Sequence, residues 1–445
     1  MGLPLLGETL EFFTPSSSFD IHPFIKKRMK NCTFSFRYGP VFKTRLVGRP
    51  LVASADQELN QLVFLQEGRL FESWYPESFT KIFGQDNASE LHGPMFKYLK
   101  SLFLKFLGSP NLRQVLLQDV QKEALSRLLS WSTQPSIELK TQIGSMIFDV
   151  IAKKLISYDP ATEKEDLKRN FSAFIRGLIS FPLNIPGTAY HRCLQGRKNV
   201  INMLKELVAE RMMSSPVGGD RADYLDHVVE ELRKENSMLT EGVALDLVFA
   251  LLYASSETPS PALTLAVKFL AENPQALQEL TDEHEEILRN RKEQESGITW
   301  EEYKSMRFTF QVINETLRLA NVAPVIFRKA LKDIHINGYT IPAGWGVMVC
   351  PPATHLNPEI YKDPLTFNPW RWKVRKEKAE TKNFMAFGGG MRLCVGAEFS
   401  KVEMAVFLHC LVTKYRWKTV RGGSIMRTPG LQFPHGYHIQ VFSKE

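Results

Sequence analysis

One cysteine of the sequence stands in a setting suited to chemistry, within the segment Phe387–Gly396. Three consecutive glycines (388–390) permit tight turns and let the backbone approach a flat ligand closely. Cys394 directly precedes a helical pattern over 397–413, so amide N–H groups and the field at the helix start would favour its thiolate form. Arg392 is able to reach an anionic group. These residue types fit a thiolate ligand held by N–H donors, or a buried structural cysteine after a glycine turn.

The complete spacing around this cysteine, Phe-x-x-Gly-x-Arg-x-Cys-x-Gly, resembles the haem-binding loop of the cytochrome P450 family. The resemblance implies that Cys394 is the proximal thiolate ligand of the iron in haem b (iron protoporphyrin IX). It also implies that Phe387, Gly388 and Gly396 shape the loop against the cofactor and that Arg392 binds it. We therefore expect a haem-thiolate enzyme.

A glutamate and an arginine three residues apart, Glu315 and Arg318, resemble the Glu-x-x-Arg helix motif of the same family. The spacing alone is weak, because Glu286 and Arg289 share it and a surface ion pair explains them. Only the first pair is followed, in family order, by Phe-Asn-Pro-Trp-Arg-Trp and then by the cysteine loop. The resemblance implies that Glu315, Arg318 and Arg371 form a buried charge triad with a structural role.

Further cations are candidates for binding the haem propionates. Arg328 follows Pro324 at the spacing that the family uses for a propionate-binding arginine, although an exposed strand arginine is the alternative. Many relatives place Trp or His, then Arg, where this chain has Lys97 and Lys100. Lysines supply the charge without the bidentate geometry, so we expect Arg392 and Arg328 to carry more of the anchoring.

A long helix is predicted from the capping residue Thr240 to Ala271. Its middle resembles the family's oxygen-binding groove, where small residues such as Ala254 leave room for dioxygen. The resemblance implies that Glu257 and Thr258 organise the waters that protonate it. The alternative is an ordinary helix interior in which the threonine hydroxyl bonds back to its own backbone.

This helix departs from the family pattern at three positions. Ser255 replaces the usual glycine, and Pro259 and Pro261 follow the threonine. Prolines in a helix interior free the carbonyls four residues earlier, here those of Ser255 and Glu257, so we expect a kink. Another departure is extra length at residues 31–36, to which we assign no role.

Periodicity elsewhere predicts a mainly α fold with a small β-rich part. A segment rich in Phe, Ile, Leu, Pro and Gly, 171–190, is either a covered loop or a mobile apolar lid. No repeat and no linker composition appears, so a single catalytic domain over residues 1–445 is expected. The resemblance implies a triangular helical prism with haem between the long helix and the cysteine loop. Helices are predicted over 119–131, 141–157 and 197–213, strands over 41–47 and 50–54, and further strand signals over 322–350.

Composition limits the partners. The 445 residues carry a net charge of +8, and no nucleic-acid-binding motif accompanies it, so nucleic acid is excluded. The resemblance gives the charge another explanation, a basic face that docks NADPH–cytochrome P450 reductase, which passes on electrons from NADPH. The segment Gly2–Gly7 resembles the hinge that follows the membrane anchor of microsomal relatives, while the anchor itself is absent. We expect a location at the membrane surface, on the cytosolic face of the endoplasmic reticulum.

Several phrases, including 22–25, 298–306 and 367–372, resemble a plant clan that oxidises brassinosteroids, sterols and triterpenoids, and family 87 within it. This implies hydroxylation of a sterol or tetracyclic triterpenoid, with successive oxidations that include side-chain cleavage as a further option. Two alternatives are a lipid rearrangement without dioxygen and a non-catalytic sterol-binding scaffold. The expected pocket wall, whose members also fit an ordinary core, comprises Phe171, Phe174, Phe181, Ala254, Val322, Val325, Ile326, Leu431 and Phe433.

Overall fold

The structure is a computed structural model. It describes residues 7–29, 39–84, 91–108, 110–159, 166–178, 180, 183–215, 223–291, 296–373 and 383–444. The chain folds into two compact units. The larger unit comprises Met1–Glu72, Leu116–Met146 and Thr258–Glu445, and the smaller unit comprises Ser73–Val115 and Ile147–Glu257.

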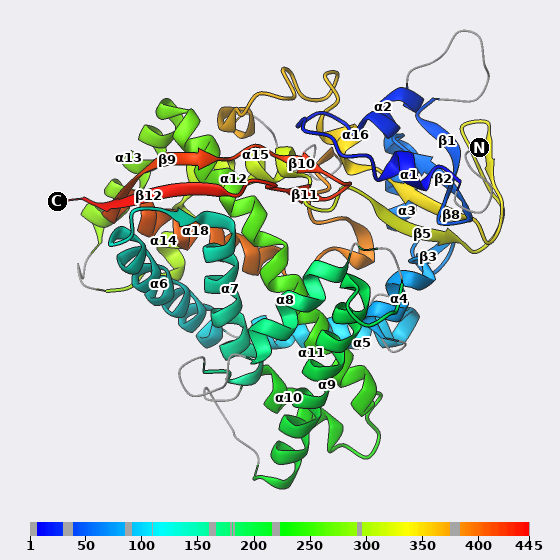
Figure 1. The fold of residues 1–445 in the computed structure, drawn as a ribbon, viewed down its shortest axis with the longest axis horizontal. Coiled ribbons are helices and arrows are strands. Elements are labelled where there is room, and N and C mark those ends of the chain that lie inside the picture. The colour runs from blue at the N-terminus through cyan, green and yellow to red at the C-terminus, as the bar shows by residue number, and fades with distance from the viewer. Residues whose placement is uncertain are drawn as a thin grey trace. The chain divides into compact units, whose positions relative to one another are not determined.

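Helices are the most frequent element of the structure (Figure 1). The helices before Thr258 are α1 (Thr9–Phe12), α2 (Pro23–Met29), α3 (Gln57–Leu65), α4 (Glu77–Phe83), α5 (Gly93–Gly108), α6 (Pro110–Ser132), α7 (Leu139–Ile156), α8 (Asp166–Leu178), α9 (Ala189–Met213), α10 (Tyr224–Leu232) and α11 (Glu241–Glu257). Those after it are α12 (Pro259–Glu272), α13 (Pro274–Asn290), α14 (Trp300–Ser305), α15 (Arg307–Ala320), α16 (Pro351–His355), η2 (Pro369–Trp372), η3 (Gly390–Arg392) and α18 (Ala397–Lys414).

The strands form small sheets, as predicted for a minor β part. One sheet has the order β1-β2-β8-β5-β3, with β2 and β8 parallel and β5 antiparallel to β8; another has the order β4-β12-β9, whose long strands run side by side in Figure 1. The remaining pairs are β10-β11 and β6-β7. The bounds are β1 (Val41–Leu46), β2 (Arg49–Ser54), β3 (Phe71–Ser73), β4 (Ile137–Glu138), β5 (Ile326–Ala330), β6 (Ile334–Ile336), β7 (Tyr339–Ile341), β8 (Gly346–Val349), β9 (Tyr415–Gly422), β10 (Met426–Arg427), β11 (Leu431–Gln432) and β12 (Tyr437–Ser443).

The predicted hairpin over 41–54 is present, but its turn lies one residue earlier than expected. Val47 and Gly48 form the turn, and both have positive φ, 49° and 73°. A two-residue turn of this type matches the twist of the paired strands, and glycine adopts it at no steric cost. The Val47 N–H donates to Thr9 Oγ1 at 2.7 Å, a tertiary contact that holds the valine in this conformation.

The core of the larger unit is built on two helices that are apolar on nearly all faces. α12 is buried from Pro259 to Val267, and α18 is buried from Val402 to Val412. A helix that is hydrophobic all round must be covered on all sides. α18 carries the chain directly away from the cysteine loop, so the start of this buried helix fixes where that loop ends.

The long helix predicted from Thr240 to Ala271 is instead two helices. Thr240 caps the first as expected, since its Oγ1 accepts the N–H of Val243 at 3.3 Å. α11 ends at Glu257, and α12 begins at Pro259 after Thr258. Proline has no N–H to continue the hydrogen-bond ladder but suits the first position of a helix. Thr258 keeps helical dihedrals (φ −88°, ψ −38°), so the helix is interrupted by one residue only, and this residue is the one predicted to handle protons.

The segment 171–190, expected to be a covered loop or a mobile lid, is helical at both of its ends. Residues up to Leu178 belong to α8, which packs on α9 in the smaller unit. A Cβ on Gly177 would lie 2.3 Å from the carbonyl oxygen of Ala189, and one on Gly196 would lie 2.5 Å from that of Asn170. The two glycines therefore permit the close approach of the helices. The sequence did not predict α8, because the prolines and glycines that follow it obscured the helical pattern of its one apolar face.

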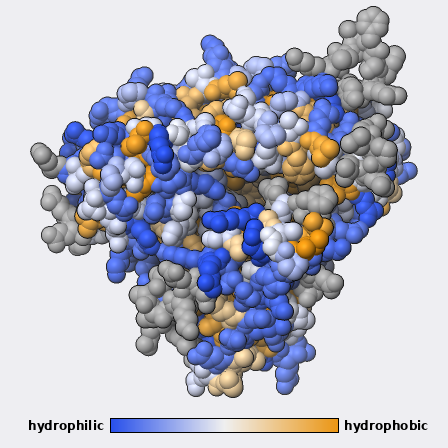
Figure 2. Space-filling model, in the orientation of Figure 1, coloured by the Kyte–Doolittle hydropathy of each residue, from blue (hydrophilic) through white to orange (hydrophobic). Residues whose placement is uncertain are grey.

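Within the described ranges, no helix is long and apolar enough to cross a membrane. The face in Figure 2 mixes hydrophilic and hydrophobic residues. The large apolar side chains with the most exposure come from four different helices: Leu10 (64%), Leu65 (71%), Leu129 (63%) and Met213 (85%). Singly exposed apolar residues of this kind are ordinary for a protein surface.

Candidate functional site: a cysteine loop and its supports

The loop around Cys394 is held by close backbone packing. Gly388 and Gly390 have φ of 73° and 61°, in the region that favours glycine. A Cβ on Gly390 would lie 1.9 Å from the carbonyl oxygen of Phe64, so only glycine fits there. The Cys394 N–H donates to the carbonyl oxygen of Phe387 at 3.0 Å. The glycines thus serve both conformation and packing, and they place the cysteine just before α18.

Cys394 differs from the other described cysteines in its exposure. None of the four is in a disulfide, and Cys193, Cys350 and Cys410 are buried whereas Cys394 is exposed. Burial raises the pKa of each of these three thiols to about 12, so they stay protonated and inert. The interpretation of Cys394 as a buried structural cysteine is therefore wrong.

The structure brings Glu315, Arg318 and Arg371 into one hydrogen-bonded cluster. Arg318 donates from Nε to Glu315 Oε2 at 2.9 Å and from Nη2 to Oε1 at 2.8 Å, and both side chains are fully buried. Arg371 Nε donates to Oε1 at 2.9 Å. The sequence did not indicate two further donors, the backbone N–H of Asn368 and the indole N–H of Trp372, each 3.0 Å from a carboxylate oxygen. The buried carboxylate therefore accepts five hydrogen bonds.

The cluster connects to the cysteine loop through His355, which sequence reasoning missed. Arg318 Nη1 donates to the His355 carbonyl oxygen at 2.7 Å. The ring of His355 donates from Nδ1 to Asn321 Oδ1 at 2.7 Å, and its Nε2 accepts the N–H of Met385 at 2.8 Å. Burial, and then the charge of Arg318, lower the pKa of His355 to about 3, so it is neutral, as an accepting Nε2 requires. Met385 lies two residues before Phe387, so the histidine joins the buried triad to the start of the loop.

The other glutamate–arginine pair with the same spacing behaves differently. No ion pair joins Glu286 to Arg289 among the described residues, and both side chains are exposed. The expected surface ion pair is therefore absent from the structure. Exposed charges of opposite sign gain little from pairing, because water screens them and long side chains lose freedom. Burial is what distinguishes Glu315 and Arg318.

Glu67 is a second residue that the sequence did not single out. It lies just after α3, its side chain is only 4% exposed, and it pairs with both arginines expected to bind propionates. Arg392 Nε donates to Glu67 Oε1 at 2.5 Å, and Arg328 Nε lies 2.8 Å from Oε2. Arg328 is buried on β5, so the interpretation as an exposed strand arginine is wrong. Two cations and one anion leave this cluster with a net positive charge.

The helix break around Thr258 has an uncovered stretch in otherwise buried surroundings. Ala254 and Thr258 are exposed, while their neighbours Leu252 and Ser256 on the chain are buried. The Ser255 hydroxyl donates to the carbonyl oxygen of Leu251 at 2.7 Å, so the residue that replaces the family's glycine bonds back to its own helix. Small and hydroxyl-bearing residues are thus presented along this stretch.

The other predicted residues fall into three groups. Lys97 is exposed and Lys100 half-buried on α5, while Phe181 lies outside the described residues. Phe171 and Phe174 are buried in an aromatic cluster with Phe249, whose ring stacks on Phe171 with centroids 5.2 Å apart. In the larger unit, Leu431 is buried, and the half-buried positions are Val322, Val325, Ile326 and Phe433. Ile326 lies beside the loop, since its Cδ1 is 3.9 Å from where a Cβ on Gly388 would be.

The residues present fit a haem-thiolate centre. The larger unit offers an exposed cysteine in a glycine loop that approaches its neighbours too closely for side chains. It also offers a buried arginine pair with net positive charge, which suits a carboxylate-bearing ligand. The chemistry of this donor set is that of a soft sulfur ligand for iron with anion anchors beside it.

Comparison with known proteins identifies the family. The family model for cytochrome P450 matches residues 10–435. "Cytochrome P450 87A3" of Oryza sativa subsp. japonica is 59% identical, with 100% of this chain and 85% of that protein covered. "Cucurbitadienol 11-hydroxylase" of Siraitia grosvenorii is 44% identical, with 100% and 92% covered. The solved structure "Retinoic acid bound cyanobacterial CYP120A1" has a TM-score of 0.86 and 25% identity, with 100% and 98% covered. The chain belongs to the cytochrome P450 family.

Family membership establishes the class of enzyme and its cofactor. The chain is a cytochrome P450 monooxygenase, its cofactor is haem b, and electrons reach it from NADPH through a reductase. The fold predicted from the sequence, mainly α with a small β part, is confirmed. The predicted likeness to family 87 is confirmed by the 59% identity to a member of it.

Proposed function

We propose that this monooxygenase hydroxylates a sterol or tetracyclic triterpenoid, with Cys394 as the thiolate ligand of its haem iron. The observation that carries the proposal is the exposed thiol of Cys394, placed by a glycine loop at the start of a buried helix while three other cysteines are buried. When bound, haem supplies the activation of dioxygen and the transfer of one oxygen atom to a C–H bond. The protein's part is to hold the ligand, anchor the cofactor and manage protons.

The cofactor anchors follow from charge. Arg392 and Arg328 bind the propionates, and Lys97 and Lys100 add positive charge from α5. Phe387, Gly388 and Gly396 shape the loop. Glu67 positions the two guanidinium groups, because it holds both through one buried carboxylate. The single anion also keeps two buried like charges from repelling each other.

Proton handling is assigned to the helix break. Ala254 leaves room for dioxygen, and Thr258 and Glu257 hold the waters that deliver protons to it. The exposed positions of Ala254 and Thr258 support this, because both are open to a small ligand while the adjoining helix is buried. Pro259 ends the hydrogen-bond ladder at this point and leaves backbone carbonyls able to bind water.

The substrate class rests on two supports. The relative that is 44% identical is by its name a hydroxylase of cucurbitadienol. The proposed wall is apolar, as a rigid tetracyclic skeleton requires, and draws on the positions predicted from the sequence: Phe171, Phe174, Phe181, Val322, Val325, Ile326, Leu431 and Phe433. A narrower proposal is that successive oxidations at one carbon end in side-chain cleavage.

The setting follows from the electron donor. We propose that the enzyme works at the cytosolic face of the endoplasmic reticulum membrane, where its reductase and apolar substrates meet, with a basic face toward the reductase. The net charge of +8 supports this docking. We also propose that both units act as a single catalytic domain over residues 1–445, which the family match across residues 10–435 supports.

A binding screen tests the substrate class. Purified holoenzyme is titrated with sterols, tetracyclic triterpenols and fatty acids, and the low-to-high-spin shift of the haem spectrum is recorded. Binders are then assayed with reductase, and NADPH and dioxygen consumed are compared with product formed. We expect a saturable shift with a tetracyclic compound and equal amounts of NADPH, dioxygen and hydroxylated product. Product formed without NADPH would establish the rearrangement alternative, and a shift with fatty acids alone would exclude the proposed substrates.

A further inference from the structure

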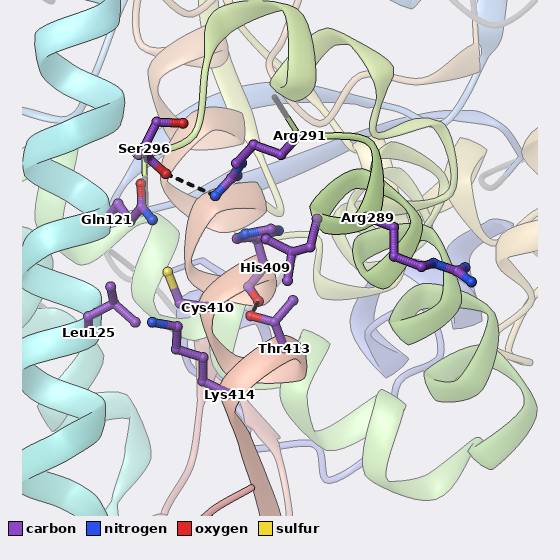
Figure 3. A pocket seen from close by; sticks show the side chains of 11 residues that line it. Gln121, Leu125, Arg289, Arg291, Ser296, His409, Cys410, Thr413 and Lys414 are labelled. Atoms are coloured by element: carbon purple, nitrogen blue, oxygen red, sulfur yellow. Dashed lines mark hydrogen bonds between the residues drawn. The ribbon is translucent and has the colours of Figure 1, made fainter. Parts of the chain in front are cut away.

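A pocket of about 650 Å³ opens in the larger unit, and none of its described lining residues belongs to the proposed haem site. Figure 3 shows Arg291, His409, Cys410 and Lys414 around a common space, faced by Gln121 and Leu125 of α6. The three residues from 409 to 414 come from the C-terminal part of α18, and Arg291 follows the end of α13. The pocket therefore has a rigid floor of packed helices and no part in the proposed chemistry.

The described lining residues carry charges of one sign, although Glu302 outside the lining pairs with Arg291. None of the described lining residues is acidic, and two cations, Arg291 and Lys414, meet the space, while Arg289 extends away from it in Figure 3. Glu302 accepts from Arg291 Nε at 2.7 Å and from Nη2 at 3.0 Å, and the Ser296 carbonyl oxygen accepts from Nη1 at 2.9 Å. A guanidinium has five N–H donors, so this fixed side chain retains two.

The other donors are also available. Within the described residues, the Lys414 ammonium has neither a hydrogen-bond nor an ion-pair partner, and this residue is exposed at the last turn of α18. Gln121 uses its carbonyl oxygen to accept the N–H of Ile298 at 2.7 Å, which leaves its amide N–H groups for a ligand. The pocket thus offers donors to an anion from three sides.

A buried chain of hydrogen bonds behind the pocket fixes the state of its histidine. Glu283 accepts from the backbone N–H of Phe308 at 2.6 Å and from both the N–H and the hydroxyl of Thr309, at 2.9 and 2.6 Å. Three donated hydrogen bonds make Glu283 an acceptor, so the Thr309 hydroxyl directs its proton there. The oxygen of Thr309, 3.0 Å from His284 Nε2, must then accept from the ring of His284.

The hydrogen bond between His284 and His409 then determines which ring nitrogen of His409 carries the proton. Burial lowers the pKa of His284 well below its ordinary value and that of His409 to about 4, so both rings are neutral near pH 7. A neutral His284 with its proton on Nε2 accepts through Nδ1, and His409 therefore donates from its own Nδ1 across 3.0 Å. Nε2 of His409 carries a lone pair and, among the described residues, has no protein partner. It is an acceptor that faces the pocket.

We infer that this pocket binds a phosphate monoester that carries free hydroxyl groups, of the size of a sugar phosphate. The phosphate oxygens accept hydrogen bonds from Arg291, Lys414 and the Gln121 amide, which are all donors. A hydroxyl group of the ligand donates a hydrogen bond to His409 Nε2, which can only accept one. The volume exceeds what a bare phosphate fills. A soluble sugar phosphate and the headgroup of an inositol lipid share this chemistry.

Calorimetry on the holoenzyme tests the inference. Glucose 6-phosphate is titrated as the probe, with sulfate and glucose as separate ligands that each lack half of the recognised chemistry. We expect saturable binding of glucose 6-phosphate and affinities at least about tenfold weaker for the other two, since each loses a charge-assisted or hydroxyl hydrogen bond. Equal affinity for all three ligands, or no saturable heat with glucose 6-phosphate, would overturn the inference.

Variants assign the contacts. Lys414→Gln is expected to weaken glucose 6-phosphate binding about tenfold, whereas Lys332→Gln, an exposed lysine outside the pocket, should leave it unchanged. Gln121→Leu should weaken it as well, which covers the case that His409→Phe does not fold. In folded His409→Phe, the advantage of glucose 6-phosphate over sulfate should disappear. Equal weakening by Lys332→Gln and Lys414→Gln would show only non-specific attraction to a basic protein.

The source of the ligand is separated by vesicles. Phosphatidylcholine vesicles with and without phosphatidylinositol 4-phosphate are added, and bound protein is measured by sedimentation. Retention that requires the phosphoinositide and is lost in Lys414→Gln assigns the pocket to a lipid headgroup. Binding of glucose 6-phosphate without such retention assigns it to a soluble ester, and neither kind of binding rejects the site. The haem spectrum should be unaffected in every case, so this test does not depend on the proposed substrate.

Discussion

The loop that carries Cys394 and the helix break that carries Thr258 are both assigned to the same reaction, yet they are held in different ways. The loop is linked through Met385 and His355 to a fully buried carboxylate that accepts five hydrogen bonds. The break is defined by a proline without an N–H and by residues left exposed. The proposed iron ligand is surrounded by rigid supports, whereas the proposed place for waters and dioxygen is open.

The largest effect is expected at the thiolate itself. Cys394→Ala removes the sulfur that supplies the soft ligand, so the red-shifted Soret band of the reduced carbon monoxide complex should be lost completely. Absorption spectra of the purified variants measure it. Cys193→Ala is the matched control, because that thiol is buried and protonated. An unchanged band in Cys394→Ala would refute the ligand assignment.

The next effect is on folding. Glu315→Gln leaves two buried arginines without their carboxylate, which costs about 3–5 kcal/mol in the free energy of unfolding. Denaturant titration followed by fluorescence measures this loss. Glu286→Gln, with the same sequence spacing to an arginine but an exposed side chain, should change stability by less than about 0.5 kcal/mol. Similar losses in both variants would mean that the buried triad has no special weight.

A smaller effect, on the rate of haem loss, is expected at the arginines that we propose anchor the cofactor. Glu67→Gln keeps the size of the side chain but loosens Arg392 and Arg328, so haem should leave about tenfold faster. Transfer of haem to apomyoglobin gives the rate without any measure of activity. Glu72→Gln is the control, since Glu72 pairs with Lys329 on the same strand as Arg328. Slower haem loss in Glu67→Gln would contradict its positioning role.

The stability that His355 contributes beside the cysteine loop should also depend on pH. The folded-state pKa of His355, about 3, lies below its ordinary 6.5, so its contribution to stability is complete above pH 6.5 and is lost as the pH falls toward 3. Over pH 4–6 one such proton contributes a slope of about 1.4 kcal/mol per pH unit. Unfolding measured at several pH values should show this slope reduced in His355→Gln and unchanged in the exposed control His335→Gln. Equal slopes in the two variants would place the acid sensitivity elsewhere.

The helix break is expected to show the smallest effect on the protein as a whole. Thr258→Ala should leave the free energy of unfolding within about 0.5 kcal/mol, because the side chain is exposed. The hydrogen peroxide released per NADPH should rise on the order of tenfold, because protons are no longer delivered in place. Thr264→Ala, a buried threonine of α12 whose hydroxyl bonds to the Ser260 carbonyl oxygen, should show the reverse pattern. Coupling unchanged in Thr258→Ala would remove its proton role.

Local pattern was sufficient for much of the fold. The hairpin over 41–54 and the helices over 119–131, 141–157 and 197–213 correspond to β1–β2, α6, α7 and α9, with the second helix ending one residue early, because periodicity and turn residues are local properties. Local pattern was insufficient near proline and glycine, because these residues occur both in loops and at the ends of helices. Pro259 was expected to interrupt the hydrogen-bond ladder of one helix, and the interruption lies at Thr258 just before it, whereas α8 was hidden by the residues after it. A breaker residue shows that a ladder is interrupted, but packing decides how far the helix before it extends.

By itself the sequence determined the class of this protein, since an uninterrupted motif around Cys394 and the order of motifs before it need no coordinates to be recognised. It also determined which residues carry charge. Only the tertiary structure decided which charges meet: Glu67 with Arg328 and Arg392 across a long stretch of chain, and His355 between the triad and the loop. The physical reason is that an ion pair or hydrogen bond depends on distance and burial, and a buried carboxylate selects partners that no spacing in one sequence reveals.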